Sequence, residues 1–160
     1  MKPTVELTRS MPHLGHPETA GLIRRAVERT LQAEGVQNPC TVSVLLTDEE
    51  GIRSLNREYR QIDRITDVLS FPLNNLIPGV FRPEDCEKDP QSGNLLLGDM
   101  ALCLPRCEQQ AKELYHSYAR EVSYLTVHSM LHLLGYDLVD EGVQKQRMRA
   151  REKEIMGEEE

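Results

Sequence analysis

The sequence predicts an α+β domain in which about five helices pack with a small, mixed sheet of four strands. Short β-branched or alternating stretches lie between segments of helical periodicity, in the order β-α-β-α-β-β-α-α-α. One helical segment is apolar nearly all round, which places it in the middle of the fold. The 160 residues contain no internal repeat or linker, so we expect one domain over residues 1–160.

The first half of the chain supplies two strands and two helices. Residues 4–8 alternate in polarity and residues 41–47 are β-branched and apolar, so both stretches favour strands. Between them, Pro17 is placed to begin a helix. Thr47 precedes Glu50 by the spacing of a capping box, so a second helix should follow the second strand.

Two further strands enclose a long loop. Residues 66–72 favour a strand that ends at a proline. Residues 74–94 have no periodicity and are rich in acids, Gly and Pro, which favours a functional or partly disordered loop. Residues 94–104 favour the fourth strand, in which Gly98 indicates a bulge.

Three helices complete the predicted fold. Pro105 begins the first of them, and its periodicity points Leu114 inward. The apolar helix follows at about residues 119–134. The last helix, at about 140–156, is strongly charged, so we expect it on the surface with Asp140 as its cap.

The composition is that of a soluble globular protein, with 39% hydrophobic and 28% charged residues. No apolar run approaches the roughly 20 residues that span a bilayer. The N-terminus lacks a hydrophobic signal region, so we expect a cytoplasmic protein without membrane contact. Four cysteines in such a protein indicate free thiols. The net charge of −7 does not favour a protein that coats nucleic acid non-specifically.

Residues 128–138, HSMLHLLGYDL, contain most of a metal-binding motif. His128 and His132 stand one turn apart on one face of the apolar helix, where two imidazoles can bind one divalent ion. Core histidines satisfied by hydrogen bonds are the commoner case at this spacing, but two polar rings in so apolar a helix need a reason. Gly135 can turn the chain back toward the pair. Leu138 stands where a third ligand is expected.

Three blocks of the sequence resemble the YbeY family of rRNA-maturation endoribonucleases. HSMLHLLGYD resembles the family pattern H-G-x-L-H-L-x-G-Y-D-H. The block at 55–72, LNREYRQIDRITDVLSFP, resembles L-N-x-x-Y-R-x-x-D-x-x-T-D-V-L-S-F-P. The block at 96–113, LLGDMALCLPRCEQQAKE, resembles the family's L-G-D-I-x-I-S stretch and the helix after it. The blocks lie in the family's order, and the match covers roughly residues 40 to 138.

The resemblance implies a metzincin-like core around a central, buried HxxxH helix. It implies single-strand-specific RNA cleavage in 16S rRNA 3′-end maturation and ribosome quality control, with a 16S rRNA precursor and a ribosomal subunit as partners. It implies that His128 and His132 are ligands of one Zn2+ per chain, and that Arg60 acts in cleavage.

These residue types suit the implied chemistry. Zinc held by three protein ligands keeps a position for water, whose pKa falls to about 7. An arginine can fork onto two phosphate oxygens, which suits Arg60, although a surface ion pair is the alternative for that residue. Arg57 and Arg64 are weaker candidates for contact with the RNA backbone. Asp67 and Asp99 also match family positions, and we expect them to orient loops or to accept backbone hydrogen bonds.

Two positions depart from related zinc enzymes. Ser129 stands where metzincin peptidases carry a general-base Glu, which argues against peptidase chemistry. Leu138 cannot bind zinc. The third place then falls to water with weaker binding, or to a nearby carboxylate, or the metal is lost. The candidate carboxylates are Asp137, Asp140 and Glu141.

The sequence therefore predicts a zinc-dependent endoribonuclease, impaired if the missing ligand is not replaced. Two other functions stay open. A non-catalytic ribosome-assembly or RNA-binding factor is favoured by Leu138, and a metal-dependent hydrolase of another substrate, including a peptidase, would use the same histidine pair.

Overall fold

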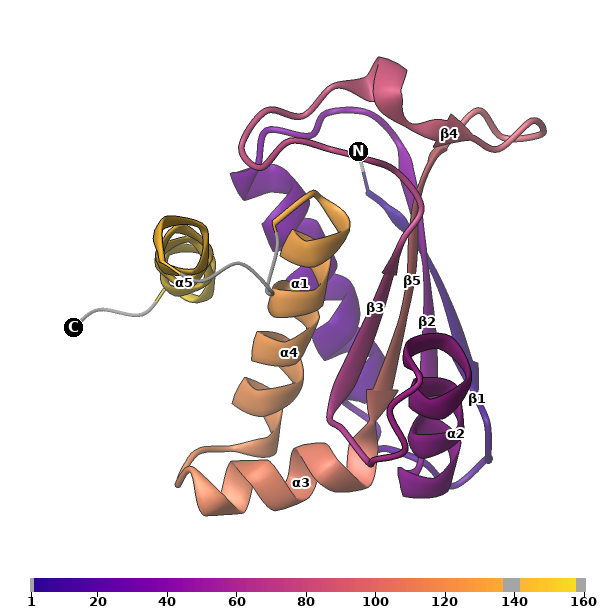
Figure 1. Cartoon of the computed structure of the whole chain (residues 1–160), viewed down its shortest axis with the longest axis vertical. Helices are drawn as coiled ribbons and strands as arrows, with labels where there is room; N and C mark the ends of the chain where they lie inside the picture. Colours follow the sequence, from indigo (N-terminus) through magenta and orange to yellow (C-terminus); the bar gives the residue numbers. More distant parts are fainter. Residues whose placement is uncertain (1, 137–141, 158–160) are drawn as a thin grey trace.

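A mixed sheet forms the centre of the computed structural model, which describes residues 2–136 and 142–157. Its long strands are β1 (Thr4–Arg9), β2 (Cys40–Thr47), β3 (Val68–Pro72) and β5 (Leu95–Cys103). β1, β2 and β5 run parallel, and β3 pairs antiparallel with β5. The strand order β1-β2-β5-β3 leaves β3 at one edge of this path, as Figure 1 shows.

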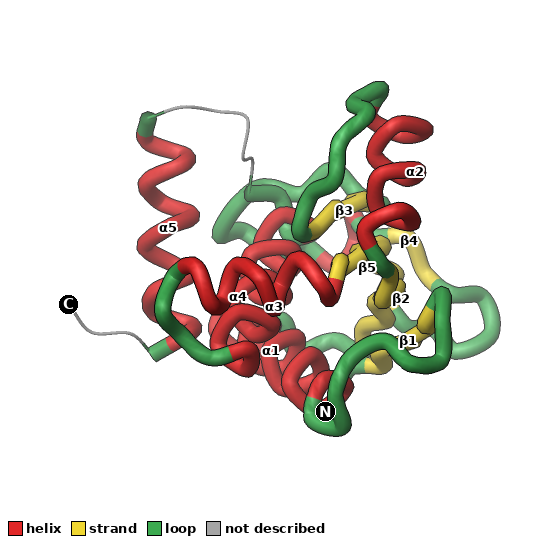
Figure 2. Tube along the Cα trace, turned by 90° about the horizontal axis from the view of Figure 1, so that it is seen from below, coloured by secondary structure: helices red, strands yellow, loops and turns green. Residues whose placement is uncertain are grey.

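Five α-helices accompany the sheet in the described part of the chain. They are α1 (Thr19–Ala33), α2 (Glu49–Arg60), α3 (Leu104–Glu113), α4 (Tyr118–Leu133) and α5 (Val143–Met156). α1 and α4 lie on one face of the sheet, and α2 covers part of the other face (Figures 1 and 2). α5 packs on the side of α4 that faces away from the sheet (Figure 1). The predicted α+β class is confirmed.

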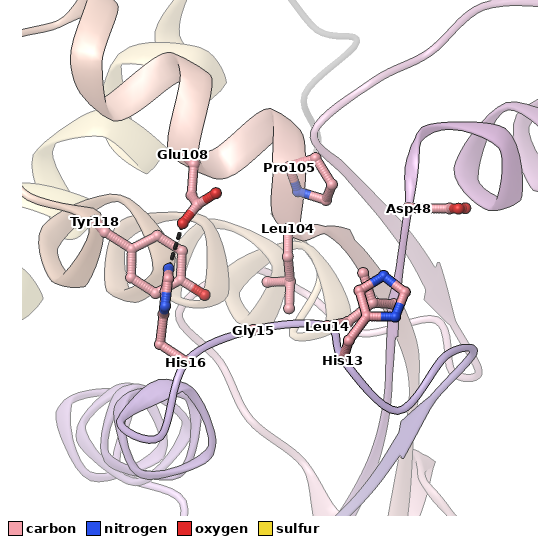
Figure 3. A pocket seen from close by; sticks show the side chains of 9 residues that line it. All are labelled: His13, Leu14, Gly15, His16, Asp48, Leu104, Pro105, Glu108 and Tyr118. Carbon is pink, nitrogen blue, oxygen red and sulfur yellow. Dashed lines mark hydrogen bonds and ion pairs between the residues drawn. The ribbon is translucent and has the colours of Figure 1, made fainter.

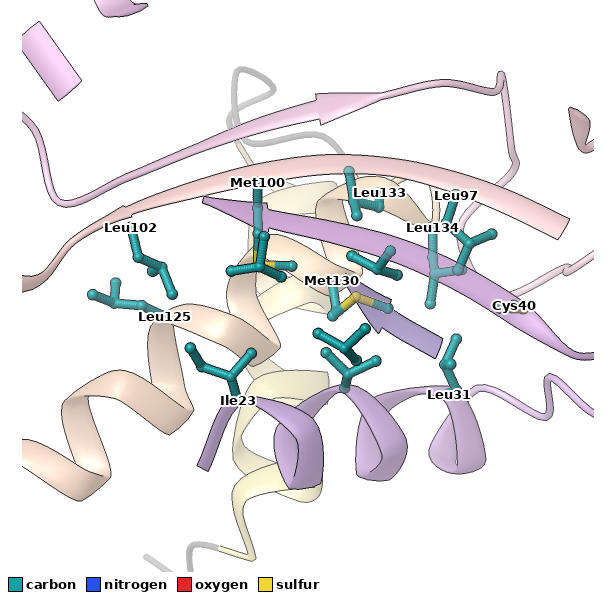
Figure 4. Packing of buried hydrophobic residues seen from close by; sticks show 14 of the residues in the cluster. Ile23, Leu31, Cys40, Leu97, Met100, Leu102, Leu125, Met130, Leu133 and Leu134 are labelled. Carbon is teal, nitrogen blue, oxygen red and sulfur yellow. The ribbon is translucent and has the colours of Figure 1, made fainter. Parts of the chain in front are cut away.

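The main hydrophobic core lies between the sheet and the pair α1 and α4. Ile23 of α1, Met100 of β5 and Met130 of α4 come from the three elements that enclose it (Figure 4). A second cluster joins α4 to α1 and α5, and its buried members are Ala26, Val127, Leu131, Tyr136, Met148 and Ile155. α4 is therefore packed on several sides, which explains why its apolar residues lie on nearly every face.

The predicted irregular loop at 74–94 contains two short elements. A 3-10 turn covers Pro83–Asp85, and the two-residue strand β4 (Glu87–Lys88) pairs antiparallel with β5. The sheet thus has five strands within the described residues, one more than the sequence predicts. A strand this short has too few residues to show an alternating pattern, so periodicity could not reveal it.

Gly98 lies at the predicted bulge. The register between β2 and β5 passes from Thr41 opposite Leu96 to Val42 opposite Gly98, which leaves one residue of β5 extra. Gly98 has φ 138°, and a Cβ there would come within 2.4 Å of the carbonyl oxygen of Phe71. Only glycine therefore lets β3 lie this close to β5.

Two predicted helix starts are wrong by one or two residues. α1 begins at Thr19 and not at Pro17, because the Thr19 hydroxyl and amide are both bonded to the loop before it. α2 is capped by Asp48, whose side chain accepts a backbone hydrogen bond of 2.9 Å from the first turn. Thr47 cannot take that role because its hydroxyl, at the buried end of β2, is bonded to Ser10 at 3.0 Å.

The inward orientation predicted for Leu114 is wrong. α3 ends before this residue, and its side chain is 59% exposed. The chain then turns through Tyr115, which has φ 57° and is 96% exposed. The helical period that points Leu114 inward therefore applies only as far as the helix continues.

α5 differs from the predicted surface helix because one of its faces is buried. Met148 and Ile155 lie in the cluster with α4, and both are at most 5% exposed. The proposed cap Asp140 lies outside the described residues. None of the helices in the described ranges is long and apolar enough to cross a membrane.

All four cysteines are buried free thiols, as predicted. Burial raises the pKa of Cys40 to about 12 and that of Cys103 to about 11. These thiols therefore stay protonated near neutral pH and are poor metal ligands and nucleophiles.

Candidate functional site

Helix α4 places His128 and His132 one turn apart on the same face. Ser117 caps the start of the helix, and its hydroxyl accepts from the amide of Arg120 at 3.0 Å. The His128 side chain is 19% exposed, and Leu131 and Leu133 on either side of His132 are fully buried. The two imidazoles therefore lie where the packed core meets the surface, as a metal pair requires.

Gly135 ends α4 with a turn that other residues could not easily make. Its φ is 108°, and a Cβ there would meet the carbonyl oxygen of Leu76 at 2.3 Å. The next residue, Tyr136, is buried and donates a hydrogen bond of 2.9 Å to Glu34 of the α1 end. The positions of Gly135 and Tyr136, just beyond the helix, are thus fixed by contacts with Leu76 and Glu34.

The gap in the metal motif falls just beyond this turn. Leu138 and the candidate replacement ligands Asp137, Asp140 and Glu141 lie outside the described residues. What completes the ligand set stays a prediction from the sequence.

Glu152 of α5 contacts His128 directly. The Nδ1 atom of His128 and the Oε2 atom of Glu152 are 2.5 Å apart. The other carboxylate oxygen accepts from the Tyr124 hydroxyl at 2.9 Å. Because Nδ1 is engaged by the carboxylate, Nε2 is the atom of His128 that is left to bind a metal.

The two histidines suit a site for a divalent metal, but they would be only two of its ligands. A ligating histidine usually donates its other ring nitrogen to a carboxylate, which is the arrangement of His128 and Glu152. Among the described residues, no group of three or more His, Cys, Asp and Glu side chains is placed to hold a metal ion. The described part of the chain could therefore supply two ligands, together with one carboxylate bonded to His128.

Ser129 joins α4 to the edge strand of the sheet. Its hydroxyl is buried and lies 2.6 Å from the hydroxyl of Ser70 in β3. The position at which metzincin peptidases carry their general base thus holds a serine whose hydroxyl is used in a hydrogen bond to the sheet. This contact also ties the helix that carries the histidines to β3.

Arg60, the last residue of α2, contacts the same strand, β3. Its guanidinium donates to the backbone carbonyl of Ser70 and stands 5.4 Å from the centre of the Phe71 ring. Its contacts within the described residues are thus with a carbonyl and a ring. Ser70 therefore connects the arginine, through Ser129, with the helix segment next to His128.

Two other arginines of this region, Arg53 and Arg57, share the carboxylate of Asp63. Arg53 donates to Asp63 at 2.7 and 3.3 Å, and Arg57 lies 3.6 Å from the same carboxylate. The bond to Arg53 lowers the pKa of Asp63, which stays ionised at neutral pH. Arg64 is exposed, and its carbonyl accepts from Asn56 at 3.0 Å. Arg57 and Arg64 thus lie near Arg60 in sequence without converging on the histidine pair.

A second histidine and carboxylate pair lies at the other end of α4. The Nε2 atom of His116 is 2.6 Å from Glu121, which is 2% exposed. Gln110 donates to Glu121 at 2.8 Å and to Asp67 at 3.1 Å. These residues line a cavity of about 500 Å³ that also reaches Tyr124, one turn before His128.

The role predicted for Asp67 is confirmed. Its second carboxylate oxygen accepts from the amide of Val68 at 2.7 Å, at the start of β3. Asp67 therefore satisfies a backbone donor and orients the loop that leads into the edge strand.

His13 and His16 line a separate pocket of about 240 Å³, shown in Figure 3. His16 is paired with Glu108 of α3, and its ring lies 4.5 Å from that of Tyr118. Tyr118 is the first residue of α4, so His128 lies about 15 Å further along the helix. These two histidines therefore do not join the metal pair.

Glu152 is the site residue that sequence reasoning missed. The sequence contains a weak indication of its role: Glu152 is four residues after Met148 and three before Ile155, so it lies on the same helix face as these two apolar residues. An acid in the middle of a buried helical stripe needs a partner. The high charge of the helix hides that stripe.

The fold and the paired histidines define an α+β protein whose HxxxH helix packs beneath a mixed sheet. The sequence profile described as Endoribonuclease YbeY matches residues 6–159, so the chain belongs to the YbeY endoribonuclease family. The family predicted from the three sequence blocks is thereby confirmed, and with it an enzyme class, the nucleases that hydrolyse RNA.

Several proteins of this family are close in sequence. Endoribonuclease YbeY of Clostridium acetobutylicum is 49% identical over 141 residues, which cover 84% of each chain. Endoribonuclease YbeY of Clostridium kluyveri is 44% identical over 141 residues, covering 84% of this chain and 85% of that one. A solution structure of a Thermotoga maritima protein has a TM-score of 0.57 and 21% identity, covering 96% of this chain and 90% of that one. The last likeness is one of fold alone.

Proposed function

We propose that this chain is a zinc-dependent, single-strand-specific endoribonuclease. Its proposed role is 16S rRNA 3′-end maturation and ribosome quality control, in the cytoplasm, with a ribosomal subunit as partner and residues 1–160 as one domain. The observation that carries the metal site is the pair His128 and His132 on one face of α4, with Nδ1 of His128 bonded to Glu152. Membership in the family supports RNA as the substrate.

The two histidines would hold the zinc, which when bound supplies a polarised water of lowered pKa. The remaining work falls to the chain's own side chains. Arg60 uses one guanidinium nitrogen on the Ser70 carbonyl and keeps other N–H donors for a phosphodiester. Such donors stabilise the negative charge that develops on the phosphate oxygens as the bond breaks.

A non-catalytic RNA-binding or ribosome-assembly factor is the second candidate, because Leu138 replaces a zinc ligand. A peptidase is less favoured, because Ser129 carries no carboxylate and its hydroxyl is bonded to Ser70.

The test is cleavage of a single-stranded RNA and of the matching duplex, with added zinc and with a chelator. We expect cleavage of the single strand, loss of cleavage with the chelator, and turnover about 10²-fold lower in Arg60→Ala, as for other positioned donors. Arg57→Ala is the matched control from the same helix and should mainly weaken RNA binding and its salt dependence.

Cleavage that persists in the chelator would refute zinc dependence. Tight RNA binding without any cleavage would favour the assembly factor. Equal turnover in the parent and in Arg60→Ala would remove that residue from the mechanism.

A further inference from the structure

We propose that Glu152 is a positioning residue that fixes the tautomer of His128 and makes metal affinity depend on the docking of α5. This inference rests on the proposed zinc site. It adds a residue from a helix that the metal motif does not include.

The geometry around Glu152 determines which nitrogen of His128 carries the proton. An ionised carboxylate can only accept hydrogen bonds. Glu152 accepts from the Tyr124 hydroxyl at 2.9 Å, and its other oxygen, 2.5 Å from Nδ1 of His128, is placed to accept a hydrogen bond from that nitrogen. The lone pair of the neutral ring is then on Nε2, the nitrogen that must bind the metal.

Tyr124 holds the carboxylate in place from the same helix. Burial, followed by the charge of Glu152, raises the pKa of Tyr124, so its hydroxyl remains a donor near neutral pH. The Tyr124 and His128 rings lie one turn apart with centroids separated by 5.9 Å. The two oxygens of Glu152 therefore bridge one turn of α4.

α5 is anchored strongly enough to deliver this carboxylate. Besides its apolar contacts, Arg151 forms an ion pair with Glu34 at 2.6 Å. Arg29 of α1 donates to the carbonyl of Ile155 at 2.5 Å. Glu152 itself is only 4% exposed, so any undocking of α5 would change both its partners and its solvation.

A purely structural role would be satisfied by the same contact, since a histidine and a glutamate on two helices hold those helices together. The two roles differ in what a neutral side chain of the same shape does. Glutamine has one acceptor oxygen and one amide nitrogen. With the oxygen kept on the Tyr124 hydroxyl, the nitrogen would face Nδ1 and stabilise the tautomer with the proton on Nε2. That tautomer has its lone pair on the wrong atom for the metal.

The decisive comparison is Glu152→Gln against Glu154→Gln. Both variants remove one charge from α5, but the Glu154 side chain is 66% exposed. Zinc affinity is measured by competition with a chromophoric chelator, and melting of the metal-free proteins checks the fold. We expect zinc binding about 10- to 100-fold weaker in Glu152→Gln and nearly unchanged in Glu154→Gln. Equal affinity in the two folded variants would overturn the proposal.

Nitrogen NMR of the metal-free protein separates this proposal from the zinc site itself. We expect the parent to show His128 with its proton on Nδ1, and Glu152→Gln to shift the ring toward the other tautomer. An unchanged tautomer would overturn the positioning role even if zinc binds. A parent that binds no zinc would refute the proposed function, while the tautomer result would still support or overturn the role of Glu152.

The dependence on docking has its own matched pair. Ile155→Ala loosens α5, whereas Ile52→Ala removes the same buried side chain from α2 on the other face of the sheet. We expect zinc binding to weaken several-fold only in Ile155→Ala, because only that change displaces Glu152. An equal loss of zinc affinity in both variants would show that the effect comes from lower overall stability and not from the position of Glu152.

Tyr124→Phe leaves the carboxylate on Nδ1, so it should lower zinc affinity less than Glu152→Gln does. A larger loss in Tyr124→Phe would overturn the assignment.

Discussion

Two histidine and glutamate pairs lie at opposite ends of α4 and have nearly the same local geometry. His128 and Glu152 are 2.5 Å apart, and their side chains are 19% and 5% exposed. His116 and Glu121 are 2.6 Å apart, and their side chains are 21% and 3% exposed. A histidine bonded to a buried carboxylate therefore does not by itself identify a metal site.

The pairs differ in the ring nitrogen that is used and in what stands nearby. His116 uses Nε2, and Glu121 shares its other oxygen with Gln110. The residues four positions on either side of His116 are Lys112 and Arg120. His128 uses Nδ1 and has His132 four positions later. A second imidazole at helical spacing is the feature that would let the His128 pair bind a metal, whereas the His116 pair connects α3, α4 and the start of β3.

The two pairs should differ most in zinc binding when a single histidine side chain is replaced by alanine. His128→Ala and His132→Ala should each lose zinc binding while the protein stays folded, because both rings lie at the edge of the core. His116→Ala should keep the zinc content of the parent. Elemental analysis with circular dichroism checks all three, and equal zinc in every variant would remove the distinction between the pairs.

Completing the ligand set should strengthen only the His128 pair. Leu138→His puts a histidine where the sequence motif predicts a third ligand, after the turn that Gly135 already provides. We expect zinc affinity to rise more than about 100-fold, since even an outer partner contributes about 10- to 100-fold. The melting temperature should rise with zinc concentration, and RNA cleavage should be faster.

Combined with His128→Ala, the same Leu138→His substitution should give little gain. If Leu138→His alone changes neither zinc affinity nor cleavage, the parent already completes its site with a carboxylate or uses no metal. A chelator titration of the parent then decides between these two cases.

The smallest expected effect belongs to the second pair. Glu121→Gln keeps the shape of the side chain but weakens its bonds to His116 and Gln110. We expect a loss of about 1–3 kcal/mol in the free energy of unfolding, measured with urea, because a buried hydrogen-bonded acid is disturbed. Zinc affinity should not change. A loss of zinc in this variant would show that the cavity beside Tyr124 is coupled to the metal pair.

The parts of the fold with strong local patterns could be predicted from the sequence. The long strands, the apolar α4 and the bulge at Gly98 each follow from spacing or from glycine geometry. The cap at Asp48 was missed because Thr47 has the expected spacing, while its hydroxyl is used by Ser10 in the folded protein. Such competition between partners distant in sequence cannot be seen in a local pattern.

The candidate site divides in the same way. His128, His132 and Arg60 belong to sequence motifs, so they can be identified as candidates without knowledge of the fold. Glu152 lies 24 residues from its partner on a helix of mostly charged residues. Its importance depends on how α5 docks, and only the packing of Met148 and Ile155 reveals that.

The position of α5 in the chain affects how the protein is made. Translation proceeds from the N-terminus, so the sheet and both histidines are synthesised before Glu152, and each domain generally folds as its chain emerges. Until α5 arrives, Val127 and Leu131 lack the part of their apolar cover that Met148 and Ile155 provide. With Glu152 as the positioning residue, a nascent chain would bind zinc weakly, and it would reach its full metal affinity only after α5 has left the ribosome.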